Sequence, residues 1–133
     1  MFYLFLVFIN IALLNKTILN GCDFQLIMKL HKKKCELIQG NIPPLNEGEI
    51  KEFLKQLPSW EIKDNRLSKQ FDFDDFKETM NFVNKVAFIV HRENHCPDMQ
   101  IHYNQVNVEI WTQSINGLSE NDFILAAKIE NMD

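Results

Sequence analysis

The chain has 133 residues, the length of one ordinary domain, and leaves little for a second. Its formal net charge of -4 argues against a protein that grips nucleic-acid backbones, because such binding needs a basic face. Its three cysteines, Cys22, Cys35 and Cys96, are odd in number and lack paired metal-ligand spacing, which argues against a full disulfide framework. The sequence therefore predicts a globular domain without direct nucleic-acid binding.

The first 44 residues differ in composition from the rest. Residues 2–14 are apolar except for Asn10, a run shorter than the about 20 residues that cross a bilayer and typical of the hydrophobic region of a signal peptide. Residues 29–34 then contribute four lysines, and a hydrophobic leader followed by a basic stretch is also the pattern of a two-part organelle address.

We therefore treat residues 1–44 as a leader or extension and predict secretory-pathway or organelle targeting. The alternatives are a translation start at Met28, which leaves a cytoplasmic protein, and an upstream extension without a role. No membrane contact is expected for the mature domain, which we place at 45–133.

The domain begins after Pro43-Pro44. Asn46 and Glu49 have the spacing of a helix capping box, and the apolar residues that follow recur at helical spacing, so we expect a helix over 47–57. Alternating apolar residues on both sides of the turn signal Asp64-Asn65 predict a β-hairpin with strands near 60–63 and 67–73.

A long helix is expected next, capped by Asp74 or Asp75 and ending near Arg92. It carries a broad apolar stripe and should be well buried. The stripe comprises Phe76, Met80, Phe82, Val83, Val86, Ala87, Ile89 and Val90. Trp60, Phe71, Phe73 and Phe76 are expected in the core.

Pro97 closes a loop over 94–97, and two further strands are expected near 99–103 and 106–111. Ser119 and Asp122 repeat the capping-box spacing and open a last helix that ends near residue 131. The order helix, two strands, helix, two strands, helix predicts an α+β domain. We expect a four-stranded antiparallel sheet with three helices on one face (α-β-β-α-β-β-α).

Two histidines, His91 and His95, flank the loop after the long helix, whereas His102 is expected at the surface. With Cys96 and no nearby acidic cluster they make too small a set for a metal site. Cys96 beside His95 is compatible with a thiolate nucleophile, although neighbours in sequence often point apart.

Several separated blocks resemble the pterin-4a-carbinolamine dehydratase family. These blocks are Leu57-Pro58-Ser59-Trp60, the run Phe71-x-Phe73-x-x-Phe76, Asn94-His95-Cys96-Pro97, Tyr103, Trp111-Thr112-Gln113 and the segment 117–122, Gly-Leu-Ser-Glu-Asn-Asp. The family typically shows Asn/Asp-His-His-Pro, an aromatic residue six positions later, a Ser/Thr-Thr-His strand end and Gly-Leu-Ser/Thr-Glu-x-Asp. The resemblance covers roughly residues 45–131, and matching spacing in several blocks makes it specific.

The resemblance implies dehydration of 4a-hydroxytetrahydrobiopterin to quinonoid dihydropterin and water, a step of tetrahydrobiopterin recycling, with no metal and no cofactor. It implies catalytic roles for His95, Cys96 and Gln113. His91 stands four residues before His95, where the family often has Glu, and is a further candidate proton carrier of this chain. The resemblance also implies a homodimer or homotetramer. The implied substrate-binding residues are Asn94, His95, Cys96, Pro97, Trp111, Thr112, Gln113, Ser114 and Asp122.

The chain departs from the family pattern at two of three histidines, because Cys96 stands at the second and Gln113 at the third. Gln113 can form hydrogen bonds but cannot carry a proton. We therefore expect reduced activity. The alternatives are an inactive member that acts as an oligomeric dimerisation or binding module, and a pterin-binding protein without turnover. For Asp122, helix capping is a sufficient explanation beside a pterin contact.

Overall fold

The structure is a computed structural model that describes residues 29–38 and 41–132. The predictions for residues 1–28 lie outside the described residues. Within the two described ranges, every helix is too short or too polar to span a bilayer.

The main elements, in chain order, are α3 (Glu47–Leu54), β1 (Glu61–Lys63), β2 (Arg66–Asp72), α4 (Phe76–Glu93), β3 (Asp98–His102), β4 (Gln105–Ile110) and α5 (Glu120–Glu130). This confirms the expected α-β-β-α-β-β-α order. Two short 3₁₀ turns accompany them, η1 (Leu30–Lys32) and η2 (Gln113–Ile115).

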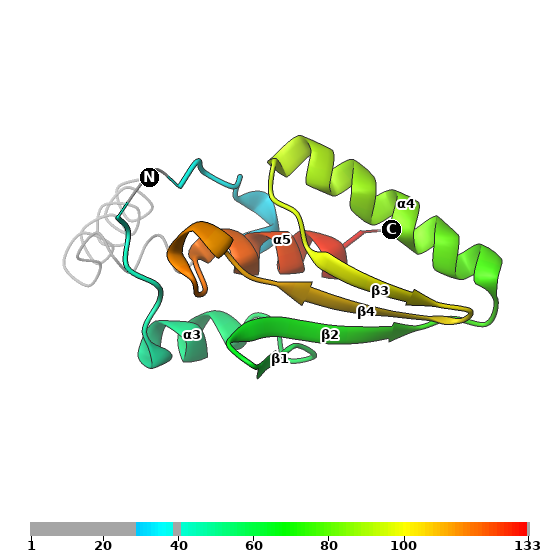
Figure 1. The fold of residues 1–133 in the computed structure, drawn as a ribbon, viewed down its shortest axis with the longest axis horizontal. Coiled ribbons are helices and arrows are strands. Elements are labelled where there is room, and N and C mark those ends of the chain that lie inside the picture. Colours follow the sequence, from blue (N-terminus) through cyan, green and yellow to red (C-terminus); the bar gives the residue numbers. More distant parts are fainter. Residues whose placement is uncertain (1–28, 39–40, 133) are drawn as a thin grey trace, which may run out of the picture.

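The four strands form one antiparallel sheet in the order β1-β2-β4-β3. Asp64 and Asn65 both have positive φ, 50° and 60°, the backbone that a two-residue hairpin turn requires. Along β4, Val106, Val108 and Ile110 are fully buried and alternate with partly exposed residues. The helices lie over this apolar face, and Figure 1 shows α4 and α5 above β3 and β4.

The helix α3 begins as predicted and ends earlier than predicted. Asn46 caps it with a complete capping box shared with Glu49. After Leu54 the N–H groups of residues 55–57 bond to carbonyls three residues back, so the last turn tightens and the α-helix ends before 57. Phe53 of α3 stacks on Phe123 of α5 with ring centroids 5.0 Å apart, which joins the two helices in the core.

The helix α4 has nearly the predicted bounds, with Asp75 as its cap, but the prediction that its apolar stripe is well buried was wrong. The buried residues are Thr79, Phe82, Val86 and Glu93. Phe76, expected in the core, is 48% exposed, and Phe88 is 67% exposed. The apolar residues of this 18-residue helix cover more of its surface than a single sheet can bury, so part of the stripe faces outward.

Candidate functional site

His95 lies in the loop that joins α4 to β3. The helix ends at Asn94, whose φ of 54° places it in the left-handed region that Asn tolerates, and its N–H donates to the Val90 carbonyl at 2.9 Å. The chain then turns toward the start of α5. There His95 Nε2 lies 2.6 Å from Asp122 Oδ1, with the imidazole side chain 14% exposed and the carboxylate fully buried.

Three groups lie at the other carboxylate oxygen of Asp122, Oδ2: the Ser119 N–H and the hydroxyls of Thr112 and Ser119. Its Oδ2 accepts the Ser119 N–H at 2.7 Å and the Thr112 hydroxyl at 2.9 Å. The hydroxyls of Thr112 and Ser119 are 2.7 Å apart. Because each hydroxyl has a single hydrogen, Thr112 donates to Asp122 and Ser119 donates to Thr112. The buried carboxylate therefore has partners on both oxygens and a fixed orientation.

The loop around η2 positions Thr112 and Ser119. The Thr112 N–H donates to the Gly117 carbonyl at 2.9 Å, which closes the loop. Gly117 cannot carry a side chain, because a Cβ there would lie 2.7 Å from Cβ of Pro44. One residue on, the Leu45 N–H donates to the Leu118 carbonyl at 2.9 Å. Residues 44–45 therefore pack against the loop that carries the hydroxyls of Thr112 and Ser119 and fix its position.

This arrangement assigns different tasks to the two nitrogens of the imidazole. A carboxylate only accepts, so Nε2 carries a hydrogen, and the neutral ring has its lone pair on Nδ1. Nδ1 forms no hydrogen bond with any residue in the described ranges. His95 can therefore take a proton at Nδ1 and release it again, while Asp122 stabilises the imidazolium that forms in between.

The remaining predicted catalytic residues lie apart from this network. Cys96 is exposed, and among the described residues the hydrogen-bond partner of its thiol is the Pro97 carbonyl, at 3.4 Å. His91 is exposed on the last turn of α4, and Gln113 is exposed on η2. Within the described part of the chain, no hydrogen bond joins any of them to His95. Their catalytic roles stay predictions.

The predicted substrate-binding residues divide in the same way. Thr112, His95 and Asp122 come together, whereas Asn94 and Ser114 are exposed and Pro97 is buried within the loop between α4 and β3. Trp111 donates from Nε1 to Asp98 Oδ2 at 3.2 Å, and the Arg66 guanidinium lies 4.8 Å from the centre of its ring. Trp111 therefore packs among charged side chains of the sheet, and its pterin contact stays a prediction.

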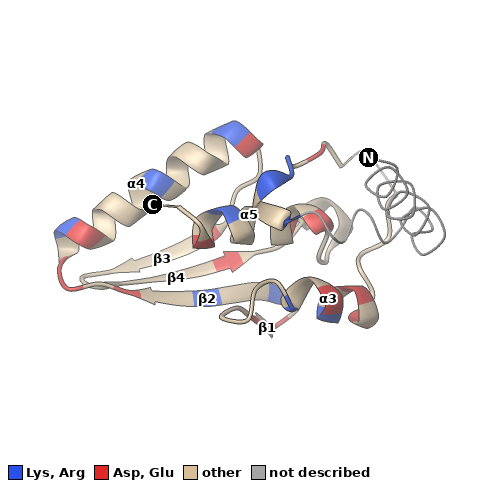
Figure 2. Ribbon diagram, turned by 180° about the vertical axis from the view of Figure 1, so that it is seen from behind, with Lys and Arg blue, Asp and Glu red and all other residues tan. Residues whose placement is uncertain are grey.

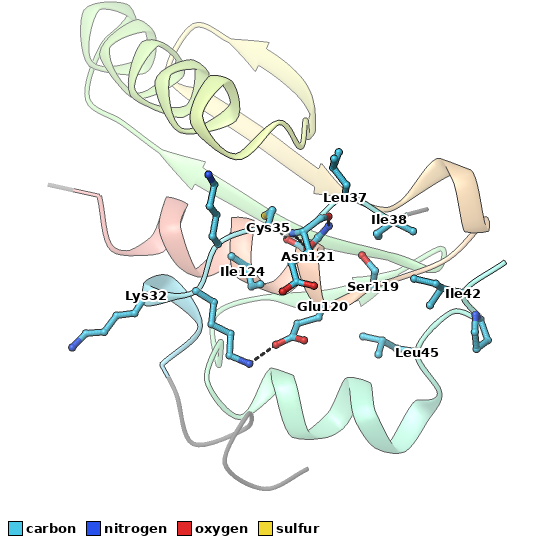
Figure 3. A pocket seen from close by; sticks show the side chains of 14 residues that line it. Lys32, Cys35, Leu37, Ile38, Ile42, Leu45, Ser119, Glu120, Asn121 and Ile124 are labelled. Atoms are coloured by element: carbon cyan, nitrogen blue, oxygen red, sulfur yellow. Dashed lines mark hydrogen bonds and ion pairs between the residues drawn. The ribbon is translucent and has the colours of Figure 1, made fainter. Parts of the chain in front are cut away.

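Sequence reasoning missed Ser119 as a member of the network, although the capping-box spacing with Asp122 already placed their groups together. It also missed a cavity of about 640 Å³ at the start of α5. Residues at the start of α5 line this cavity together with residues 32–38 and with Ile42, Pro43 and Leu45 (Figure 3). His95 is not among its described lining residues. No group of His, Cys, Asp and Glu suited to a metal ion occurs in the described ranges.

Comparison with known proteins identifies the family. The family model described as pterin 4 alpha carbinolamine dehydratase matches residues 43–132. This chain belongs to that family. The match includes every residue of the His95–Asp122 network, and so the network lies within the part of the chain that defines a pterin 4 alpha carbinolamine dehydratase.

Individual proteins with this family name are also similar to the chain in sequence, and a solved structure is similar in fold. A Nitrosomonas eutropha protein named "Putative pterin-4-alpha-carbinolamine dehydratase" is 49% identical over 112 residues, 84% of this chain and 94% of its own length. A Rickettsia canadensis protein of the same name is 45% identical over 104 residues, 77% of this chain and 95% of its own. A crystal structure of a transcriptional coactivator/pterin dehydratase from Brucella melitensis superposes with a TM-score of 0.63 at 31% identity. It covers 65% of this chain and 95% of that one.

Proposed function

We propose that this chain dehydrates 4a-hydroxytetrahydrobiopterin to quinonoid dihydropterin and water, with His95 as the proton carrier. The observation that carries the proposal is the His95–Asp122 pair, in which a partly exposed imidazole has one nitrogen fixed by a buried carboxylate and the other unbonded among the described residues. Such a pair in a family of pterin dehydratases matches the acid and base chemistry that the reaction needs.

The proton balance of the reaction explains how one imidazole suffices. The substrate loses a proton from a ring nitrogen, and the hydroxyl on C4a gains a proton as its C–O bond breaks and water leaves. One proton is removed and one is returned, so the net change on the protein is zero. We propose that His95 Nδ1 accepts the first proton and donates it to the leaving hydroxyl, while Asp122 holds the ring through Nε2.

The other catalytic candidates then act as auxiliaries. Cys96 is adjacent in sequence and exposed, and His91 lies one helical turn earlier, so either is a candidate for a second proton carrier. Gln113 can donate and accept hydrogen bonds to the pterin but cannot exchange a proton with it. This division predicts a slower enzyme than one with three titrating groups, because a positioned acid or base contributes about 10²–10⁴-fold.

A turnover assay on the full chain tests the proposal. We expect the native protein to accelerate dehydration over buffer and His95→Ala to lose about 10²–10⁴-fold of that acceleration. His102→Ala is the matched control, because His102 is an exposed histidine on β3 without a contact to the network. Native protein that does not exceed buffer, or equal losses in the two variants, would reject the proposal.

A second candidate function is an oligomeric binding module without turnover. The observation that favours it is the exposed apolar part of α4, where Phe88 is 67% exposed. Pterin binding without acceleration would indicate a pterin-binding protein. Neither binding nor turnover, together with a stable oligomer, would support the binding module.

A further inference from the structure

An N-terminal segment lies against the site although it precedes the part of the chain matched by the family model. We call residues 29–38 the strap. Leu30 anchors it, because this side chain is 1% exposed within the core and its N–H donates to Gln56 Oε1 at 3.2 Å. From η1 the strap passes the first turn of α5, where Lys33 forms an ion pair with Glu120 (Figure 3).

The strap binds the residue that precedes Asp122. Glu36 and Asn121 form a reciprocal pair. The Glu36 N–H donates to Asn121 Oδ1 at 3.0 Å, and Asn121 Nδ2 donates to the Glu36 carbonyl at 2.6 Å. Asn121 is 8% exposed, so both of its polar atoms depend on these bonds. The first turn of α5, with Asp122, is therefore fixed against the strap.

The strap also binds the end of α4, two residues before His95. The Cys35 N–H donates to Glu93 Oε2 at 3.0 Å, and Lys128 of α5 donates to Glu93 Oε1 at 2.8 Å. The Glu93 side chain is 4% exposed, and a carboxylate so deeply buried is stable only with such partners. Glu93 thus connects the strap, α4 and α5 at one point.

We propose that the strap is a positioning element of the site. Through its hydrogen bonds to Asn121 and Glu93, the strap fixes the start of α5 relative to the end of α4. It thereby keeps His95 Nε2 within hydrogen-bonding distance of Asp122. The match to the Nitrosomonas eutropha relative spans 112 residues of a chain of 133, so it extends over the strap and is not confined to residues 43–132. The catalytic part of this inference rests on the proposed function, whereas its structural part does not.

The first experiment measures whether the strap is docked, with Leu30→Ala against Leu37→Ala in the full chain. Leu37 is the matched control, because it lies on the same strap and is 76% exposed. Burial, reinforced by Glu93, raises the pKa of the Cys35 thiol to about 12, so the docked thiol reacts slowly with a labelling reagent. In a Cys22→Ser/Cys96→Ser background, we expect Leu30→Ala to speed the labelling of Cys35 about tenfold and Leu37→Ala to leave it unchanged.

The second experiment measures the His95–Asp122 pair in the same variants, below their melting temperatures and with native cysteines. The ring ¹⁵N chemical shifts of His95 report which nitrogen carries the hydrogen. We expect the Nε2–H form in the native protein and in Leu37→Ala, and a mixture of both forms in Leu30→Ala. In the turnover assay we expect kcat of Leu30→Ala to fall about tenfold, as for a weakened acid or base.

A second variant pair covers the case in which Leu30→Ala does not fold. Asn121→Ala removes both bonds to Glu36 and keeps Leu30 buried, and Asn131→Ala at the other end of α5 removes a comparable bond to the Ala127 carbonyl. We expect only Asn121→Ala to change the labelling rate and the ring shifts.

Faster labelling with unchanged ring shifts would overturn the inference, because the pair would then be independent of the strap. Unchanged labelling in both Leu30→Ala and Asn121→Ala would also overturn it. If the native protein shows no turnover, the proposed function fails, and the labelling rates and ring shifts still decide whether the strap positions the pair.

Discussion

The two carboxylate oxygens of Asp122 accept hydrogen bonds from different partners. Its Oδ2 completes the capping box of α5 by accepting the Ser119 N–H, and its Oδ1 accepts Nε2–H of His95. Sequence reasoning treated helix capping and a site role as competing explanations of this residue. The geometry makes them compatible, because capping fixes the rotamer that presents the other oxygen to the imidazole.

Asp122→Asn tests the second task. The amide keeps the size of the side chain but loses the charge that stabilises an imidazolium, so we expect kcat to fall about 10²-fold. Asp75→Asn is the control, because Asp75 caps α4 with a hydrogen bond to the Glu78 N–H and Asn is an equally good cap. Equal turnover by both variants in the dehydratase assay would contradict the role of Asp122.

Thr112→Val tests the support of the carboxylate. Valine has nearly the same shape and lacks the hydroxyl that donates to Asp122 Oδ2, so we expect a loss of about 1–3 kcal/mol in the free energy of unfolding. Thr79→Val is matched, because Thr79 is also buried and its hydroxyl donates toward the carbonyls of Asp75 and Tyr103. Urea unfolding should show similar losses, whereas kcat should fall only in Thr112→Val. A fall in both variants would mean that stability alone limits turnover.

At the scale of elements, local sequence patterns predicted the order and most bounds of the helices and strands. Asn46, Asp75 and Ser119 all cap helices as their spacing indicated, and the pair Asp64-Asn65 makes the hairpin turn. The buried face of α4 could not be predicted in the same way. A stripe of apolar residues gives the helix, but which part of it is buried depends on where the sheet lies.

The candidate site could be predicted only in part. The spacing of the family blocks located His95, Thr112 and Asp122 before their contacts were known. The strap could not be located, because its bonds join residues far apart in sequence, such as Cys35 to Glu93 and Glu36 to Asn121. The basic composition of residues 29–34 resembled a targeting signal and gave no indication that Lys33 pairs with Glu120.

Glu93 makes the junction of strap, α4 and α5 sensitive to acid. Burial alone would raise the pKa of its carboxyl, but hydrogen bonds from Lys128 and the Cys35 N–H hold the pKa below its usual value. Because the folded-state pKa lies below the unfolded one, the stabilisation is complete above the unfolded value. It is lost as pH falls from about 4.3 through the folded value.

Glu93→Gln removes the contribution of this carboxylate to the pH dependence of stability. We expect the variant to be about 1–3 kcal/mol less stable at pH 7, because Lys128 loses its charged partner, and to lose less stability than the native chain on acidification. The control is Glu52→Gln, since Glu52 and Lys55 form an exposed ion pair at the end of α3. Urea midpoints between pH 7 and pH 3 measure both effects. The same acid slope in native protein and Glu93→Gln would show that other carboxylates dominate.

At the scale of the whole molecule, the apolar outer side of α4 is a feature that the proposed site does not explain. In Figure 2 the ribbon of α4 is mostly uncharged along its length, and its charged positions lie mainly at the two ends. The exposed aromatic residues include Phe88 in the C-terminal half of the helix and Phe76 at its start, where Phe76 stacks on the exposed Tyr103 with ring centroids 6.1 Å apart. Apolar surface of this kind is typical of an interface between protein chains.

We expect the full chain to associate with itself through this side of α4, in line with the homodimer or homotetramer that the family resemblance implies. Phe88→Asp places a charge within the expected interface, where an unpaired charge is strongly disfavoured on burial, so the oligomer should dissociate to monomers. Leu37→Asp is the control, because it introduces the same charge at a leucine that is 76% exposed and lies on the strap, outside α4. Sedimentation equilibrium over a range of concentrations measures the mass of each form. A native monomer at high concentration, or a Phe88→Asp variant with the native mass, would show that α4 faces solvent in the functional protein.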